Sequence, residues 1–201
     1  MRRVAVYRIV VVLAGIAVAS PAHAHLVETG FGDFYDGIAH VAVTPADLLV
    51  VVALALLAGQ RGAGAARNVA FALPVAWLAG GLIGARWPSL SALPLLTTLS
   101  FALAGALVAL NAGLRGVSVA LLAVAAGLLH GLANGATMAP AGVGGLVLGG
   151  AVSAIFFLTT LLSAEVSALP TGWPRIAVRV AGSWIAATGL LMLGWLAHSA
   201  P

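Results

Sequence analysis

The feature of this sequence that most restricts its fold is a series of six long apolar stretches separated by short polar segments. Their approximate bounds are 44–59, 68–84, 93–110, 117–132, 143–164 and 176–197. Only 7% of the residues are charged, whereas roughly a quarter are charged in a soluble domain. Because a backbone in lipid must satisfy its hydrogen bonds internally, each stretch is expected to be a helix. The sequence therefore predicts an all-α membrane protein, a bundle of six transmembrane helices.

The first 24 residues have the three parts of a secretory signal peptide. Arginines at positions 2, 3 and 8 form a basic region, and an apolar run follows at residues 9–19. That run is shorter than the roughly 20 residues of a membrane-spanning helix. Ala22-His23-Ala24 supplies a small-x-small cleavage pattern. We expect cleavage after Ala24, which leaves residues 25–201 as a single six-helix transmembrane domain; an uncleaved N-terminal anchor is the alternative.

The arginines predict the orientation. The formal net charge of +4 includes nine arginines and no lysine, and their scattered spacing gives no basic patch for nucleic acid. With residue 25 outside, the cytoplasmic side receives Arg61, Arg67, Arg115, Arg175 and Arg179. Only Arg86 falls in a loop on the other side, so the positive-inside rule agrees with the signal peptide. Both ends of the mature chain are expected outside.

This topology gathers the candidate metal ligands on the outer face, including His40 and Asp47. Pro45 suits the first turn of a helix, which puts Asp47 at the edge of the bilayer. A membrane acid at that depth indicates a functional site with a partner. The alternatives are that Asp47 stays hydrated and stabilises the helix N-terminus, and that His40 is an ordinary interfacial histidine. The aromatic segment at residues 30–37 is expected to lie in the membrane interface.

His130 and Asn134 lie four residues apart near the outer end of the fourth stretch. They share a face if the helix continues through Gly131 and Gly135. Both side chains are then able to face one ligand. The alternative is a pair of polar groups that close a helix ended by glycine.

Cleavage after Ala24 would expose a further ligand. His25 would carry a free α-amine beside its imidazole, and nitrogen donors suit nickel, copper and zinc. The alternative is that alanine-histidine is a common signal-peptide ending. The sequence contains no cysteine, so a thiolate site is excluded.

The segment HGLANGATMAP resembles the fourth-span motif HG-x-A-H-G-x-E-x-P of the HupE/UreJ family, membrane accessory proteins of hydrogenase and urease that are associated with nickel permeation. The histidine-terminated signal peptide, a first span with His and Asp, and the six-span layout extend the resemblance over nearly the whole chain. His130, Gly131, Ala133 and Gly135 match the motif. The resemblance implies an inner-membrane protein of a bacterium.

The chain departs from the family pattern at several strong donors. Asn134 replaces a second histidine and Thr137 replaces a glutamate. In the first span His40 and Asp47 correspond to the pattern, but Leu48 replaces a histidine; in the fifth, Ser163 stands where many members have one. The ligand set implied by the resemblance is His40, Asp47, His130 and Asn134, with His25 as a further donor.

Two functions follow from these observations. The first is a divalent-metal permease or metal-accessory protein, with Ni²⁺ as the leading substrate and metalloenzyme maturation proteins as partners. The second is a non-transporting membrane scaffold that keeps the family fold without binding metal. An enzyme is not expected, because the sequence contains neither a nucleophile motif such as G-x-S-x-G nor a metalloprotease motif of the H-E-x-x-H type. An ion pair between Glu165 and Arg175 or Arg179 is expected near the end of the fifth stretch.

Overall fold

A computed structural model of the chain describes residues 28–87, 93–138 and 145–199, and all the regular secondary structure within them is α-helix. The helices are α2 (Asp33–Val43), α3 (Pro45–Gln60), α4 (Ala63–Gly84), α5 (Pro94–Ala109), α6 (Gly116–Met138), α7 (Gly145–Ala168) and α8 (Trp173–Ser199). The expected signal peptide and His25 lie outside the described residues.

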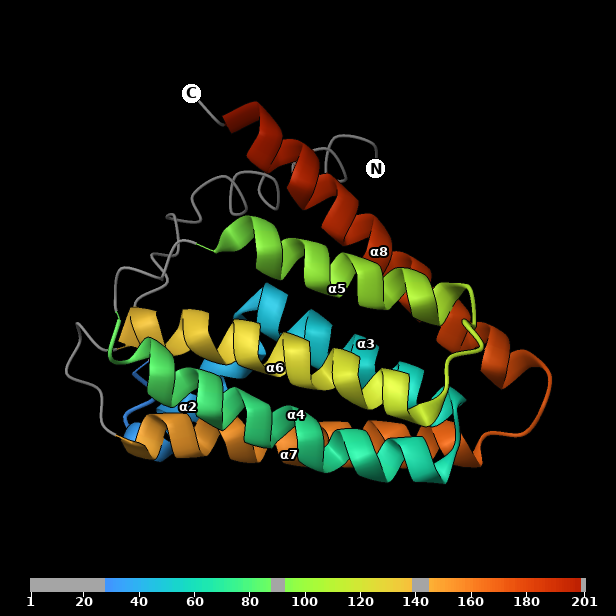
Figure 1. The fold of residues 1–201 in the computed structure, drawn as a ribbon, viewed down its shortest axis with the longest axis horizontal. Coiled ribbons are helices and arrows are strands. Elements are labelled where there is room, and N and C mark those ends of the chain that lie inside the picture. The colour runs from blue at the N-terminus through green and yellow to red at the C-terminus, as the bar shows by residue number, and fades with distance from the viewer. Residues whose placement is uncertain (1–27, 88–92, 139–144, 200–201) are drawn as a thin grey trace, which may run out of the picture.

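Four of these helices, α4, α6, α7 and α8, are long and apolar enough to cross a membrane. The pair α2 and α3 passes the same criteria together but is bent by 77° between the two helices, and α5 is a shorter apolar helix. The protein is therefore a helical membrane protein. The connections α3–α4, α5–α6 and α7–α8 all lie at one end of the bundle (Figure 1).

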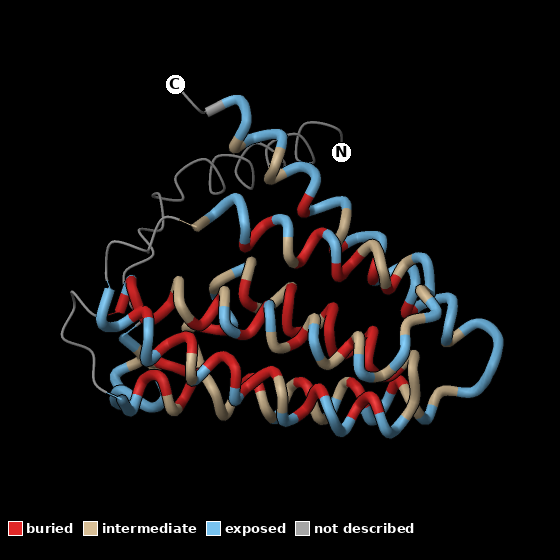
Figure 2. The backbone as a smooth tube through the Cα atoms, viewed as in Figure 1, coloured by how far each residue is buried: buried red, intermediate tan, exposed pale blue. Residues whose placement is uncertain are grey.

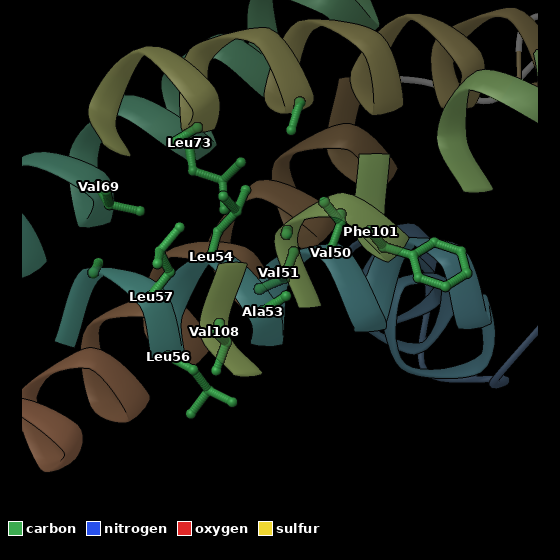
Figure 3. Packing of buried hydrophobic residues seen from close by; sticks show 14 of the residues in the cluster. Val50, Val51, Ala53, Leu54, Leu56, Leu57, Val69, Leu73, Phe101 and Val108 are labelled. Atoms are coloured by element: carbon green, nitrogen blue, oxygen red, sulfur yellow. The ribbon is translucent and has the colours of Figure 1, made fainter. Parts of the chain in front are cut away.

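Helix α3 is the central element. Every residue from Ala53 to Gly59 is buried, and Leu54 and Leu57 pack among side chains of α4 and α5 such as Leu73 and Val108 (Figure 3). In contrast, α8 buries a narrow stripe and leaves most of its surface exposed (Figure 2). Many of its exposed residues are large and apolar, among them Leu190 and Leu191. An apolar outer surface of this kind suits contact with lipid.

Helices α4 and α6 pack closely because glycines line their contact. A Cβ atom on Gly131 of α6 would overlap the backbone oxygen of Trp77, and one on Gly135 would overlap that of Gly81. Gly84 of α4 approaches Leu132 in the same way. Small residues allow this approach of backbones in membranes. The glycine-rich segment AGGLIGA, residues 79–85, therefore forms a packing face of α4.

Two local features go beyond the sequence-based expectations. Residues 30–37, expected to lie in the membrane interface, include the start of helix α2 (33–43), and Phe31 and Tyr35 are exposed there. Helix α6 continues through Gly131 and Gly135 to Met138, six residues beyond the expected bound. A helix end inside an apolar environment would leave carbonyl groups unsatisfied, which favours its continuation.

Candidate functional site

Asp47 lies in the first turn of α3 and is 3% exposed. The helix begins at Pro45, as expected, and Thr44 before it is extended (φ −93°, ψ 102°) because proline disfavours a helical residue at that position. The chain therefore turns sharply between α2 and α3. The alternative of a hydrated Asp47 is wrong: its carboxylate faces the interior, where an unpaired charge would be costly.

His130 and Asn134 of α6 are the hydrogen-bond partners of this carboxylate. His130 Nδ1 lies 2.7 Å from Asp47 Oδ1, and Asn134 Nδ2 donates to Asp47 Oδ2 at 2.9 Å. His130 is fully buried and Asn134 is 6% exposed. The two side chains share a face because α6 continues past them, so the alternative of a helix ended by glycine is wrong. Three polar residues from two helices thus form one buried network.

The other ring nitrogen of His130 is held by Ser100 of α5. His130 Nε2 lies 2.8 Å from Ser100 Oγ. The Ser100 hydroxyl is also 2.7 Å from the carbonyl oxygen of Thr97, to which it can donate. A carboxylate only accepts, so Nδ1 carries a proton toward Asp47. Neutral His130 then accepts the Ser100 proton at Nε2. Protonated His130 instead donates to Ser100, whose hydroxyl donates to Thr97, so both protonation states leave His130 fully bonded.

This connectivity matches the Ser–His–Asp order of serine hydrolases, but its surroundings do not. Those enzymes aim backbone N–H groups at the developing oxyanion. Ser100 lies inside α5, where backbone N–H groups bond within the helix. Its neighbours in α5 therefore offer no such donors, and the interaction positions the His130 ring.

His40 stands apart from this closed network. It lies in the last turn of α2, and its Nε2 atom is 3.7 Å from Asp47 Oδ2. Its side chain is 13% exposed, yet Nε2 itself is buried and has no hydrogen-bond partner. The turn at Thr44 folds α2 back so that this imidazole faces the carboxylate. Among the candidate ligands that the structure describes, His40 is the one whose ring nitrogen is buried beside Asp47 without a hydrogen-bond partner.

Trp77 of α4 completes the surroundings of His130. The two ring centroids are 5.3 Å apart with an interplanar angle of 34°, and Trp77 is fully buried. Its indole Nε1 has no hydrogen-bond partner. Neither Trp77 nor Ser100 was singled out from the sequence. The cluster Thr97, Thr98 and Ser100 inside an apolar span was the available signal for Ser100.

Other residues noted in the sequence lie away from the network. Thr137 is exposed and donates to the Asn134 carbonyl at 2.9 Å, and Glu28 is exposed. Ser163 is buried beside Gly59, at the opposite end of α3 from Asp47. Across residues 28–87, 93–138 and 145–199, no group of three or more His, Asp or Glu side chains is arranged to hold one ion.

The expected ion pair of Glu165 is not formed. Within the described residues, the ion pairs closer than 4 Å join Asp47 to His40 and to His130. Arg175 donates to the Leu169 carbonyl and Arg179 donates to the Ala109 carbonyl. These arginines therefore bind the carbonyl groups at the ends of α7 and α5 instead of an acid.

The fold and the network define a helical membrane protein with a buried His–Asp centre near one end of its bundle. The family model described as HupE / UreJ protein matches residues 11–192, so the chain belongs to the HupE/UreJ family. Comparisons with curated proteins and with solved structures each gave no match. Membership makes it a membrane accessory protein of the nickel- and metal-associated class, and the resemblance seen in the sequence is confirmed.

Proposed function

We propose that this protein is a permease or metal-accessory protein for a divalent cation, with Ni²⁺ as the leading substrate, and that His40 and Asp47 first receive the ion. The observation that carries the proposal is the position of His40 Nε2, a buried atom without a hydrogen-bond partner, 3.7 Å from Asp47 Oδ2. Nitrogen and oxygen ligands bind a small divalent ion at about 2.0–2.2 Å each, so one ion can bridge these two atoms.

His130 and Asn134, the other described members of the ligand set, orient Asp47 and do not contact the ion first in this proposal. Both oxygens of Asp47 are oriented by His130 and Asn134, and both nitrogens of His130 are occupied by Asp47 and Ser100. Partners of this kind fix a ligand and tune its basicity. His130 and Asn134 therefore hold Asp47 in place, and they become ligands only if the network opens. Water and the amino-terminal His25 supply the remaining positions.

A site with two strong protein donors suits permeation better than storage. Conduction requires binding that is favourable enough to admit an ion and weak enough to release it. Buried hydroxyl groups follow on α7 toward the opposite end of the bundle: Thr159 is fully buried and Ser163 is 1% exposed. The Thr159 hydroxyl has no hydrogen-bond partner. These groups offer polar positions along the interior between the two ends.

The membrane arrangement in this proposal has six crossings by α3, α4, α5, α6, α7 and α8. The signal peptide is removed after Ala24, and both mature termini lie outside a bacterial inner membrane. The arginines support this orientation, since the described ones other than Arg86 cluster at the end opposite Asp47. The site then faces the periplasm, from which the ion enters.

Calorimetry of purified protein with Ni²⁺ tests the first step. His40→Ala is expected to weaken binding by at least about tenfold, since one imidazole ligand is lost. His198→Ala is the matched control, because His198 is an exposed histidine at the end of α8. Uptake of Ni²⁺ by a nickel-transport-deficient cell tests transport with the same variants. The proposal fails if the wild-type protein binds no divalent ion, or if the two variants behave alike.

A scaffold function is the second candidate, and one observation favours it. Asp47 is already satisfied by His130 and Asn134, as in a purely structural buried network. The polar end of the bundle would then seat a partner protein. Co-purification of a stable partner that a chelator does not release, together with absent metal binding, would support this function over the first.

A further inference from the structure

The end of the bundle opposite Asp47 contains a small pocket lined by three arginines. The pocket has a volume of about 70 Å³ and is lined by Arg61, Arg175 and Arg179 together with Gln60, Asn111 and nearby apolar residues. Arg61 follows α3, whereas Arg175 and Arg179 belong to the first turns of α8. The sequence spacing indicated scattered arginines, and the fold brings these three together.

Each guanidinium is anchored by the protein but has donors to spare. Arg61 binds the Asn111 side chain and Arg179 Nε donates to the Ala109 carbonyl at 2.9 Å. Arg175 donates to the Leu169 carbonyl at 3.3 and 3.4 Å. A guanidinium has five N–H donors, so most remain unused. One of them, Arg61 Nε, is buried without a partner.

The positive charge of this pocket is not balanced by the described residues. In the described part of the chain, no carboxylate lies within 4 Å of these three arginines, and Glu165 on α7 is exposed and forms no ion pair. Arg175 also lies in the first turn of α8, where the helix dipole is positive and the first turn contains no acid. The positive-inside rule explains why arginines lie at this end of the bundle. It does not explain why three guanidinium groups line one pocket.

We propose that this pocket binds the phosphate group of an anionic ligand. Arginine presents planar, paired donors that match phosphate oxygens, and a helix N-terminus adds a favourable field for an anion. A single water needs about 10–15 Å³ of cavity volume on the same measure, so a pocket of about 70 Å³ has room for a group of several atoms such as phosphate. Gln60 Oε1 is a buried acceptor without a partner, and a phosphate that carries one proton can satisfy it.

Two sources can supply this chemistry: free phosphate, or the headgroup of phosphatidic acid at the membrane surface. Thermal unfolding of the full chain in neutral detergent, with increasing inorganic phosphate, tests the first source. Nanodiscs of phosphatidylcholine with or without phosphatidic acid test the second. A ligand that binds only the folded state raises the unfolding temperature as its concentration rises. A rise in either arm identifies the source, and no rise in both arms overturns the proposal.

Arg175→Gln and Arg179→Gln are the test variants, and Arg115→Gln is the control. Arg115 is an exposed arginine in the α5–α6 connection that does not line the pocket, so its removal changes net charge equally. Each test variant is expected to weaken phosphate binding by about tenfold or more, while the control retains wild-type binding. If Arg179→Gln does not fold, Arg175→Gln decides alone. An equal loss in the control would mean non-specific charge attraction and would overturn the proposal.

Discussion

Asp47 and His130 are 83 residues apart in the chain, yet His130 Nδ1 lies 2.7 Å from Asp47 Oδ1 in the interior of the bundle. The relationship joins the start of α3 to the C-terminal half of α6 and depends on where α3 begins and where α6 ends. The turn at Thr44 places the carboxylate at the first turn of α3, and the continuation of α6 places His130 and Asn134 on one face. Buried hydrogen bonds to a charged group are among the strong ones in proteins.

Replacement of Asp47 by asparagine should separate charge from shape. The variant keeps the volume but brings an amide N–H toward either His130 or Asn134, where the wild-type protein has an acceptor. Loss of a hydrogen bond to a buried charged group costs about 1.5–3 kcal/mol. We expect a comparable loss in the free energy of unfolding in detergent and the loss of Ni²⁺ binding. Wild-type Ni²⁺ affinity in folded Asp47→Asn would contradict the ligand role of Asp47.

Ser100→Ala should affect the orientation of His130 more than the stability of the fold. The change removes one buried hydrogen bond, worth about 1 kcal/mol, and leaves His130 Nε2 without its partner. Nuclear magnetic resonance should show a shifted His130 Nε2 signal because its hydrogen bond is lost, and Ni²⁺ affinity should fall less than in His40→Ala. Ser100→Thr retains the hydroxyl and should restore the spectrum. An unchanged histidine spectrum in Ser100→Ala would exclude the positioning role.

The apolar stretches were sufficient to predict helices, because lipid leaves the backbone few other structures. Residue type and spacing also identify His40, Asp47, His130 and Asn134 as candidate ligands, and the fold brings these four side chains close together. Spacing does not identify Ser100 or Trp77, although the hydroxyl cluster Thr97, Thr98 and Ser100 is a weak signal for Ser100. A serine in an apolar helix and a tryptophan in a core have no spacing rule, and their contacts with His130 depend on how α4, α5 and α6 pack.

Two errors have a common physical cause. A glycine such as Gly135 is a common helix end, so the sequence allows α6 to stop there. Glu165 is close to Arg175 in the sequence, which favours an ion pair between them. In the structure, packing of α6 against α4 favours continuation through the glycines, and Arg175 instead binds a carbonyl at the end of α7. Tertiary contacts therefore outweighed local signals at both places.

Gly131→Ala should separate α4 from α6. A Cβ atom there would overlap the Trp77 carbonyl oxygen, and overpacking of this kind costs about 1–3 kcal/mol. Alanine gains up to about 1 kcal/mol over glycine in a helix, so the net effect is destabilising. Thermal unfolding in detergent measures it, and Trp77 fluorescence reports the local change. Gly149→Ala in α7 is the control, because a Cβ there meets nothing within 4 Å. Equal unfolding temperatures for the two variants would contradict the close packing.

Acidification should open the start of α2, the helix that carries His40. Asp36 accepts hydrogen bonds from the Thr29 hydroxyl at 2.6 Å and from the Thr29 backbone N–H at 2.7 Å. These two bonds, of which the hydroxyl bond has the larger effect, lower the pKa of the partly exposed Asp36 carboxyl below its ordinary value of 3.8. Because the folded chain favours the carboxylate, the stabilisation is present above that ordinary value and is lost as the pH falls through the folded pKa.

Hydrogen exchange of the amides at residues 29–36, corrected for the intrinsic effect of pH, measures this opening. Protection in the wild-type protein should fall as the pH is lowered through the folded pKa of Asp36. Asp36→Asn should have low protection throughout and no such pH response, since its amide cannot form the charged interaction. Asp33→Asn, which removes the other exposed acid of the first turn of α2, should keep the wild-type response. A pH response that follows Asp33 instead of Asp36 would show that the Thr29 bonds do not hold the start of the helix.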